Sequence, residues 1–135
     1  MDRITAPARV DSLHAVNDFL REKLEECACP REILLQIRLA LEEVFVNISS
    51  YAYRGGEGNV EVRCCLLEEP RRIEIRILDR GEPFDPLSVD PADTSEEALL
   101  AREGGLGILL VCGTMDDVKY RYEDGKNVLT IIKKL

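Results

Sequence analysis

The sequence predicts an α+β domain in which helices pack on one face of an antiparallel sheet. Two long stretches of the 135-residue chain carry apolar residues at helical spacing, and two later pairs of segments carry the alternation of hairpin strands. A short apolar helix is expected between the two strand pairs. Helices and strands that are grouped along a chain in this way are typical of the α+β class.

Composition favours one globular domain, taken here as residues 1–135. Apolar residues make up 45% of the chain and charged residues 33%. No apolar run approaches the ~20 residues that span a bilayer, and residues 1–10 contain no apolar signal core, so we expect a cytoplasmic protein with no membrane contact. The formal charge of −8 argues against direct binding of nucleic acids, and an odd cysteine count of five favours free thiols.

The N-terminal half predicts a short strand and two helices. Residues 3–6 have a weak strand pattern, and residues 11–26 form an amphipathic helix. Pro30 stands where the first turn of a second helix tolerates it. That helix extends to about residue 51, with an apolar stripe formed by Ile33, Leu34, Ile37, Leu41, Val44, Phe45 and Ile48.

The second half predicts two hairpins that flank a loop and a helix. The first hairpin pairs residues 59–68 with 71–79. Residues 86–103 are rich in proline and acidic residues, and so long a segment without clear structure is expected to be a functional lid. A glycine turn then opens an apolar helix at 104–111, and a final hairpin turns at Asp124-Gly125.

The second helix offers the first candidate site. Glu43 and Asn47 are four residues apart and are therefore neighbours on one helix face, beside the apolar stripe. A carboxylate and a carboxamide together can hold a hydrated Mg²⁺ and orient a hydroxyl group. An ordinary solvated helix face would show the same pattern.

Two further segments contain residues that could bind a ligand. Asp79 ends a strand of alternating isoleucines, and with Gly81 and Phe84 close behind it could accept a hydrogen bond from an amine such as that of adenine. The loop of Gly104, Gly105, Leu106 and Gly107 opens a helix, where main-chain amides can approach an anion. An ordinary turn and a tight lid connection are the alternatives at these two places.

In their order along the chain, these three motifs resemble the GHKL ATPase superfamily, and within it the anti-sigma-factor serine kinases of bacteria. The resemblance runs from the helix that contains Glu43 and Asn47 to the glycine loop before Ile108, and Asp79-x-Gly81-x-Pro83-Phe84 is its adenine-side motif. It implies a Bergerat-type two-layer α/β sandwich with helices on one face of a mixed, mainly antiparallel sheet.

The resemblance also assigns roles to the candidate residues. Glu43 matches the acid that activates the attacking hydroxyl, and Asn47 matches the Mg²⁺ ligand. Asp79 and Gly81 match the adenine-binding pair. The lid lies between this pair and the phosphate-flanking glycines, which Gly105 and Gly107 match. ATP and Mg²⁺ are the implied cofactors.

The implied activity is that of a serine/threonine-protein kinase that phosphorylates an anti-sigma-factor antagonist, binds a sigma factor and forms a homodimer. Tyr51 departs from the pattern, because relatives usually have a histidine at this position. A second function therefore stays open, that of a catalytically silent module that responds to nucleotide and sequesters a sigma factor or another partner.

Overall fold

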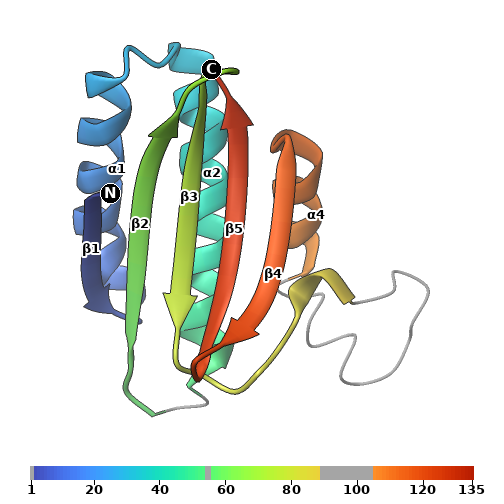
Figure 1. Cartoon of the computed structure of the whole chain (residues 1–135). Coiled ribbons are helices and arrows are strands. Elements are labelled where there is room, and N and C mark those ends of the chain that lie inside the picture. The colour runs from blue at the N-terminus through green and yellow to red at the C-terminus, as the bar shows by residue number, and fades with distance from the viewer. Residues whose placement is uncertain (1, 54–55, 89–104) are drawn as a thin grey trace.

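The computed structural model describes residues 2–53, 56–88 and 105–135, in which helices cover one face of a five-stranded sheet (Figure 1). The helices are α1 (Leu13–Glu26), α2 (Arg31–Asn47) and α4 (Gly105–Thr114). A 3₁₀ turn at Val10–Ser12 precedes α1, and a second one lies at Pro86–Ser88. The two layers confirm the predicted α/β sandwich.

Five strands form the sheet in the order β1-β2-β3-β5-β4. Their bounds are Asp2–Pro7 for β1, Asn59–Leu67 for β2, Arg72–Asp79 for β3, Asp117–Glu123 for β4 and Lys126–Lys134 for β5. Every neighbouring pair runs antiparallel. The described sheet therefore has no parallel pair, where the sequence analysis allowed a mixed sheet.

The core lies between the sheet and the helices and follows the predicted periodicities. On α2, the residues of the apolar stripe that are fully buried include Ile37, Leu41 and Phe45. They pack against the inward residues of the central strands, where Ile73, Ile75 and Ile77 alternate with charged side chains. Each fully buried side chain of this size contributes about 1.5–3 kcal/mol to folding.

The elements confirm the predicted ranges with small shifts. The weak pattern at residues 3–6 is a full edge strand, and Pro30 directly precedes α2 as its N-cap residue. Asp124 and Gly125 form the last turn with positive φ angles of 54° and 73°, a conformation that glycine and aspartate tolerate best. The predicted lid at about 86–103 lies outside the described residues, apart from the 3₁₀ turn at its start.

Candidate functional site

Three segments that are distant in the sequence meet at one end of the sandwich (Figure 1). They are the C-terminal end of α2, the end of β3 with the turn that follows it, and the start of α4, which packs along α2. Each of these segments carries one of the predicted motifs. The fold therefore brings the motifs together, although they are separated by 20 or more residues in the chain.

Glu43 and Gly107 are in direct contact between α2 and α4. A methyl group built on Gly107 would overlap the Oε2 atom of Glu43 and would lie 3.1 Å from its Cδ atom. No other residue fits at position 107 unless Glu43 moves. Ile108 and Val111 are buried beneath α4 and fix the helix in this position.

Asn47 ends α2 one turn beyond Glu43, on the same side of the helix. The backbone then widens into a π-helical turn at Ile48–Ala52. Such turns are rare and occur frequently at functional sites. The apolar spacing predicted a continuous α-helix over these residues, and the change in helix type at Ile48 differs from that prediction.

Asp79 is a buried carboxylate at the end of β3, with 6% of its surface exposed. Its Oδ1 atom accepts hydrogen bonds from the Gly81 backbone N–H at 2.9 Å and from the Asn127 side chain at 3.0 Å. Burial raises the pKa of Asp79, and these two hydrogen bonds oppose part of that rise. Because both bonds go to Oδ1, Oδ2 remains the oxygen that can accept a hydrogen bond from a ligand amine.

Gly81 lies against the π-helical turn. A methyl group on Gly81 would lie 2.7 Å from the Ala52 Cβ atom and 2.8 Å from the Ala52 carbonyl carbon. The Glu82 N–H also donates to the Ala52 carbonyl oxygen at 3.3 Å. The turn after Asp79 is thus held against the end of α2, at a distance that only glycine allows.

Asn127 organises this turn, although none of the sequence motifs includes it. Its side-chain amide donates to the carbonyl oxygens of Gly81 at 3.3 Å and Glu82 at 3.0 Å, in addition to Asp79. Its Oδ1 atom accepts from the Phe84 N–H at 3.1 Å and from the Tyr120 hydroxyl. A polar residue on the inward face of a strand that continues with Leu129 and Ile131 was the signal that could have identified it.

Tyr53 is a second residue that the motifs did not reveal. Its hydroxyl donates to the Asn59 carbonyl oxygen at 2.6 Å and accepts from the Arg80 N–H at 2.9 Å. Tyr53 thereby joins the end of the helical segment to the beginning of β2 and to the residue that follows Asp79.

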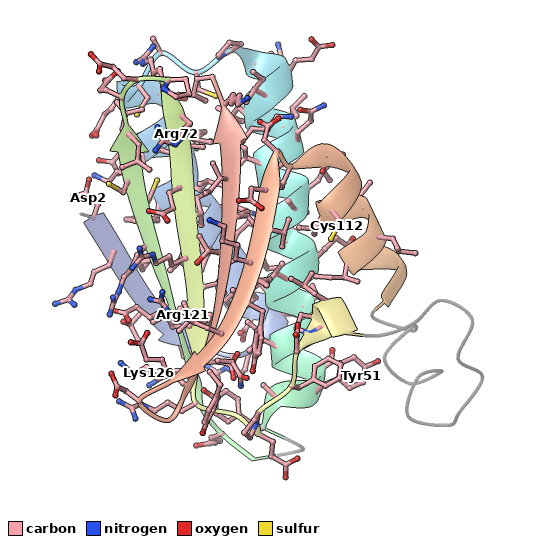
Figure 2. The ribbon with its side chains drawn as sticks, turned by 45° about the vertical axis from the view of Figure 1, so that its right-hand side comes forward. Asp2, Tyr51, Arg72, Cys112, Arg121 and Lys126 are labelled. Carbon is pink, nitrogen blue, oxygen red and sulfur yellow. The ribbon has the colours of Figure 1, made fainter. Side chains whose placement is uncertain are left out.

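Two exposed aromatic side chains border the site. Tyr51 belongs to the π-helical turn, is 45% exposed and projects outward at this end of the molecule (Figure 2). Phe84 is 48% exposed, so its side chain does not pack into the core. Its backbone is nevertheless fixed by the hydrogen bond to Asn127.

The rest of the glycine loop is described only in part. Gly105 and Leu106 form the first residues of α4, whereas Gly104 lies outside the described residues. Within the described ranges, no group of three or more His, Cys, Asp or Glu side chains could hold a metal ion, and no helix is long and apolar enough to cross a membrane. All five cysteines are free thiols.

Comparison with known protein families gives a match over nearly the whole chain. Residues 6–133 match the family described as the histidine kinase-like ATPase domain. The serine-protein kinase RsbW of Listeria monocytogenes is 33% identical over 103 residues, which are 73% of this chain and 64% of that protein. RsbW of Bacillus cereus is 32% identical over 97 residues, or 69% of this chain and 59% of that protein. The chain thus spans about three fifths of the length of these relatives.

Two solved structures share the fold. The crystal structure of the RsbU and RsbW domains of Rv1364c from Mycobacterium tuberculosis superposes with a TM-score of 0.66 and 16% identity, covering all of this chain and 33% of that one. The histidine kinase domain of a blue-light activated histidine kinase from Erythrobacter litoralis gives 0.56 and 16%, covering 96% of this chain and 61% of that one. At 16% sequence identity, these two matches show a shared fold alone.

Proposed function

Because the chain belongs to the family of histidine kinase-like ATPase domains, in the GHKL superfamily, we propose that it binds ATP and transfers the γ-phosphate to a serine or threonine of a partner protein. The contact between Glu43 and Gly107 is the observation that carries this proposal. It joins the candidate catalytic carboxylate to the loop that would flank the phosphates, at the same end of the fold as the buried Asp79.

Adenine fits the Asp79 side of the site. The Oδ2 atom of Asp79 would accept a hydrogen bond from the exocyclic amine, in an environment where burial strengthens polar contacts. Gly81 and the exposed ring of Phe84 lie in the same turn and would border the base. Asn127 would hold this turn in place before the nucleotide arrives.

The phosphates fit the α4 side. Gly104, Gly105, Leu106 and Gly107 lead into the N-terminus of α4, where main-chain amides and the helix dipole favour an anion. Asn47 offers a carboxamide oxygen for Mg²⁺, an ion that keeps several waters and is commonly completed by substrate phosphates. When bound, Mg²⁺ would neutralise charge on those phosphates.

Glu43 would act as the base of the transfer. Its carboxylate would take the proton of the acceptor hydroxyl as the hydroxyl oxygen bonds to the γ-phosphorus and ADP leaves. Positioning and neutralisation of charge supply most of the catalysis in such transfers, so a fixed carboxylate beside the phosphate loop is well suited to the reaction.

The resemblance to the RsbW serine-protein kinases suggests the biological setting. We propose that the acceptor is an anti-sigma-factor antagonist, that the chain also binds a sigma factor, and that it acts in the cytoplasm as a homodimer.

A second candidate function rests on Tyr51, which occupies a position where relatives usually have a histidine. A module of this kind would bind ATP and change partners without transferring phosphate. The presence of Glu43 against the glycine loop favours the kinase, since a pure binding module has no use for a base in that place.

The test is incubation of the chain with ATP, Mg²⁺ and a candidate antagonist, with intact mass of the antagonist as the readout. The kinase predicts one added phosphate and its loss in Glu43→Ala, with ATP affinity nearly unchanged. Binding of ATP without any transfer would support the silent module, and equal transfer by Glu43→Ala would remove Glu43 from the mechanism.

A further inference from the structure

The sheet has a second face, which no helix of the described residues covers (Figure 1). The inward face of each strand packs into the core, as at Val62, Ile75 and Ile131. The residues between these positions therefore point to the opposite side. We call this side the open face.

The open face is cationic on an acidic protein. Strand alternation places eight cationic residues and four carboxylates on it, which gives +4, while the whole chain carries −8. The rest of the chain thus carries −12. The cations are Arg3, Arg63, Arg72, Arg76, Lys119, Arg121, Lys126 and Lys134, and the carboxylates are Glu61, Glu74, Asp117 and Glu123.

Four of the cations form a row across the sheet. Arg3 is directly opposite Arg63, which is opposite Arg76, and Thr130 separates Arg76 from Lys119. Like charges directly opposite each other on neighbouring strands destabilise a sheet. Core packing does not require this row, because its side chains point away from the helices.

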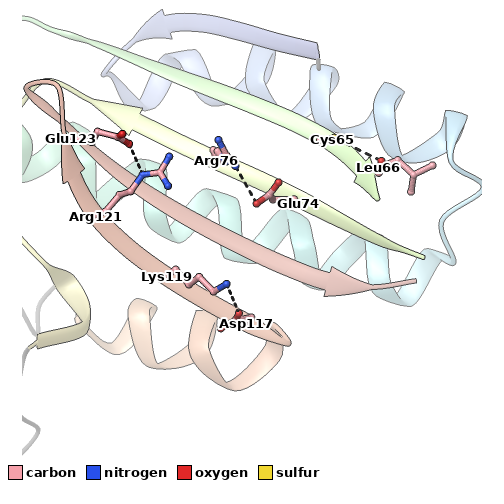
Figure 3. A network of polar contacts seen from close by, with 8 residues as sticks. All are labelled: Cys65, Leu66, Glu74, Arg76, Asp117, Lys119, Arg121 and Glu123. Atoms are coloured by element: carbon pink, nitrogen blue, oxygen red, sulfur yellow. Dashed lines mark hydrogen bonds and ion pairs between the residues drawn. The ribbon is translucent and has the colours of Figure 1, made fainter. Parts of the chain in front are cut away.

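Carboxylates compensate the row only in part, because Glu61 is shared between Arg63 and Arg3, which it meets at 3.5 Å, and the four cations therefore have three carboxylates. Arg63 pairs with Glu61 at 3.0 Å, and Arg76 with Glu74 at 3.6 Å. Figure 3 shows the second pair beside those of Lys119 and Arg121, which reach Asp117 at 3.3 Å and Glu123 at 2.8 Å. The Nε atoms of Arg63 and Arg76 are buried and have no hydrogen-bond partner within the described structure.

One end of the open face, beside Asp79 and Asn127, is already shielded from water. Leu78 and Val128 point to this side, yet only 6% and 3% of their surfaces are exposed. Long charged side chains can cover apolar neighbours with their aliphatic stems, so the open face combines charged groups with apolar residues that water does not reach. Arginine, which supplies five of the eight cations, is enriched at protein–protein interfaces.

From these observations we infer that the open face is a docking surface for an acidic surface of a partner protein. Carboxylates of the partner would form ion pairs with the side chains of the cationic row and reduce the repulsion between these cations. A second copy of this chain is disfavoured because two +4 faces would repel each other. Nucleic acid is disfavoured because carboxylates interrupt the cationic surface, and the chain as a whole is acidic.

A poly-glutamate peptide labelled with fluorescein is the probe for this surface, and its anisotropy at low salt is the measurement. We expect saturable binding that weakens as salt is added. The double variant Arg63→Gln/Arg76→Gln should bind about tenfold more weakly. Lys119→Gln, on an exposed edge-strand residue, should weaken binding without a risk to folding.

The matched control is Arg21→Gln, an exposed arginine on the outside of α1. It should leave peptide affinity unchanged, and the double variant should keep its affinity for ATP, because the open face is independent of the nucleotide site. Equal weakening by Arg21→Gln, or no effect of the double variant, would overturn the proposal. Tighter binding of labelled single-stranded DNA, lost in the same variants, would overturn the assignment to a protein partner.

Discussion

The Cα atom of Gly107 lies against the carboxylate of Glu43, so that a methyl group at position 107 would stand 3.1 Å from the Glu43 Cδ atom and overlap Oε2. This contact links α4, which follows the predicted lid in the chain, to the candidate base on α2. A movement of the glycine loop would therefore be transmitted directly to Glu43.

Gly107→Ala should displace the Glu43 side chain and reduce phosphoryl transfer at least about 100-fold, a cost typical of misplaced catalytic groups. ATP binding should weaken less, because the adenine side is untouched. Gly113→Ala, on the same helix, is the matched control, since nothing lies within 4 Å of the added methyl group. Transfer rates for the two variants are the measurement, and equal rates would show that the Glu43 contact has no catalytic importance.

Asp79→Asn should change the dependence of stability on pH. The folded-state pKa of Asp79 is raised above its ordinary value of 3.8 because the carboxyl group is buried. Its contribution to stability is therefore present below about pH 4 and is lost as the pH rises through the raised pKa. Chemical denaturation of both proteins from pH 3 to 7 should show wild type losing stability relative to the variant. If wild type instead gained stability relative to Asp79→Asn as the pH rises, this would contradict a raised pKa of Asp79.

Asn127→Ala should destabilise the protein by about 2–4 kcal/mol, because it removes several buried hydrogen bonds at once and leaves Asp79 without its side-chain donor. It should also weaken ATP binding, since the turn from Gly81 to Phe84 loses its anchor. Asn59→Ala, at an exposed position, should stay within about 0.5 kcal/mol of wild type. Urea denaturation of the two variants is the comparison, and similar free energies of unfolding would refute the role of Asn127.

Tyr53→Phe should cost about 1–2 kcal/mol, because the hydroxyl bridges Asn59 and Arg80 through two hydrogen bonds. Tyr51→Phe removes the same atom from an exposed ring two residues earlier and should change stability by less than about 0.5 kcal/mol. The difference between the melting temperatures of the two variants measures how much the two hydrogen bonds of the Tyr53 hydroxyl stabilise the protein. No difference would mean that water replaces the hydroxyl at no cost.

Cys64 and Cys112 should differ in how fast they react with a thiol reagent. Burial raises the pKa of Cys64 to about 12, so almost no thiolate is present at neutral pH. Cys112 is exposed on α4 and should react first with a thiol reagent at pH 8, whereas Cys64 should react only after unfolding. Peptide mapping after timed labelling gives the order, and early labelling of Cys64 would contradict its burial.

The sequence was sufficient to predict most of the fold because local patterns and burial agree. The isoleucines of β3 and the apolar stripe of α2 face the same core, so their periodicity alone predicted the element types and the inward faces. The hairpin turn at Asp124 and Gly125 followed from its residue types. The π-helical turn at Ile48–Ala52 could not be predicted, because its apolar spacing resembles that of an ordinary helix.

The candidate site was predictable only where its residues belong to motifs. Glu43, Asp79 and Gly107 were identified in this way, and the structure adds that Glu43 touches Gly107. Asn127 lies 48 residues from Asp79 in the chain and joins it only through strand pairing, so no local pattern links the two. Asn127 nevertheless had a visible signal, which was a polar side chain at an inward strand position.

We propose that this end of the sandwich binds ATP through the buried carboxyl group of Asp79. Titration of the protein with ATP and Mg²⁺ in a calorimeter tests it most directly, with Asp79→Asn measured alongside. We predict saturable binding by the wild-type protein at one site per chain and its loss in the variant, which remains folded. The absence of binding to the wild-type protein at millimolar ATP, or equal affinity in the variant, would show that Asp79 does not hold ATP.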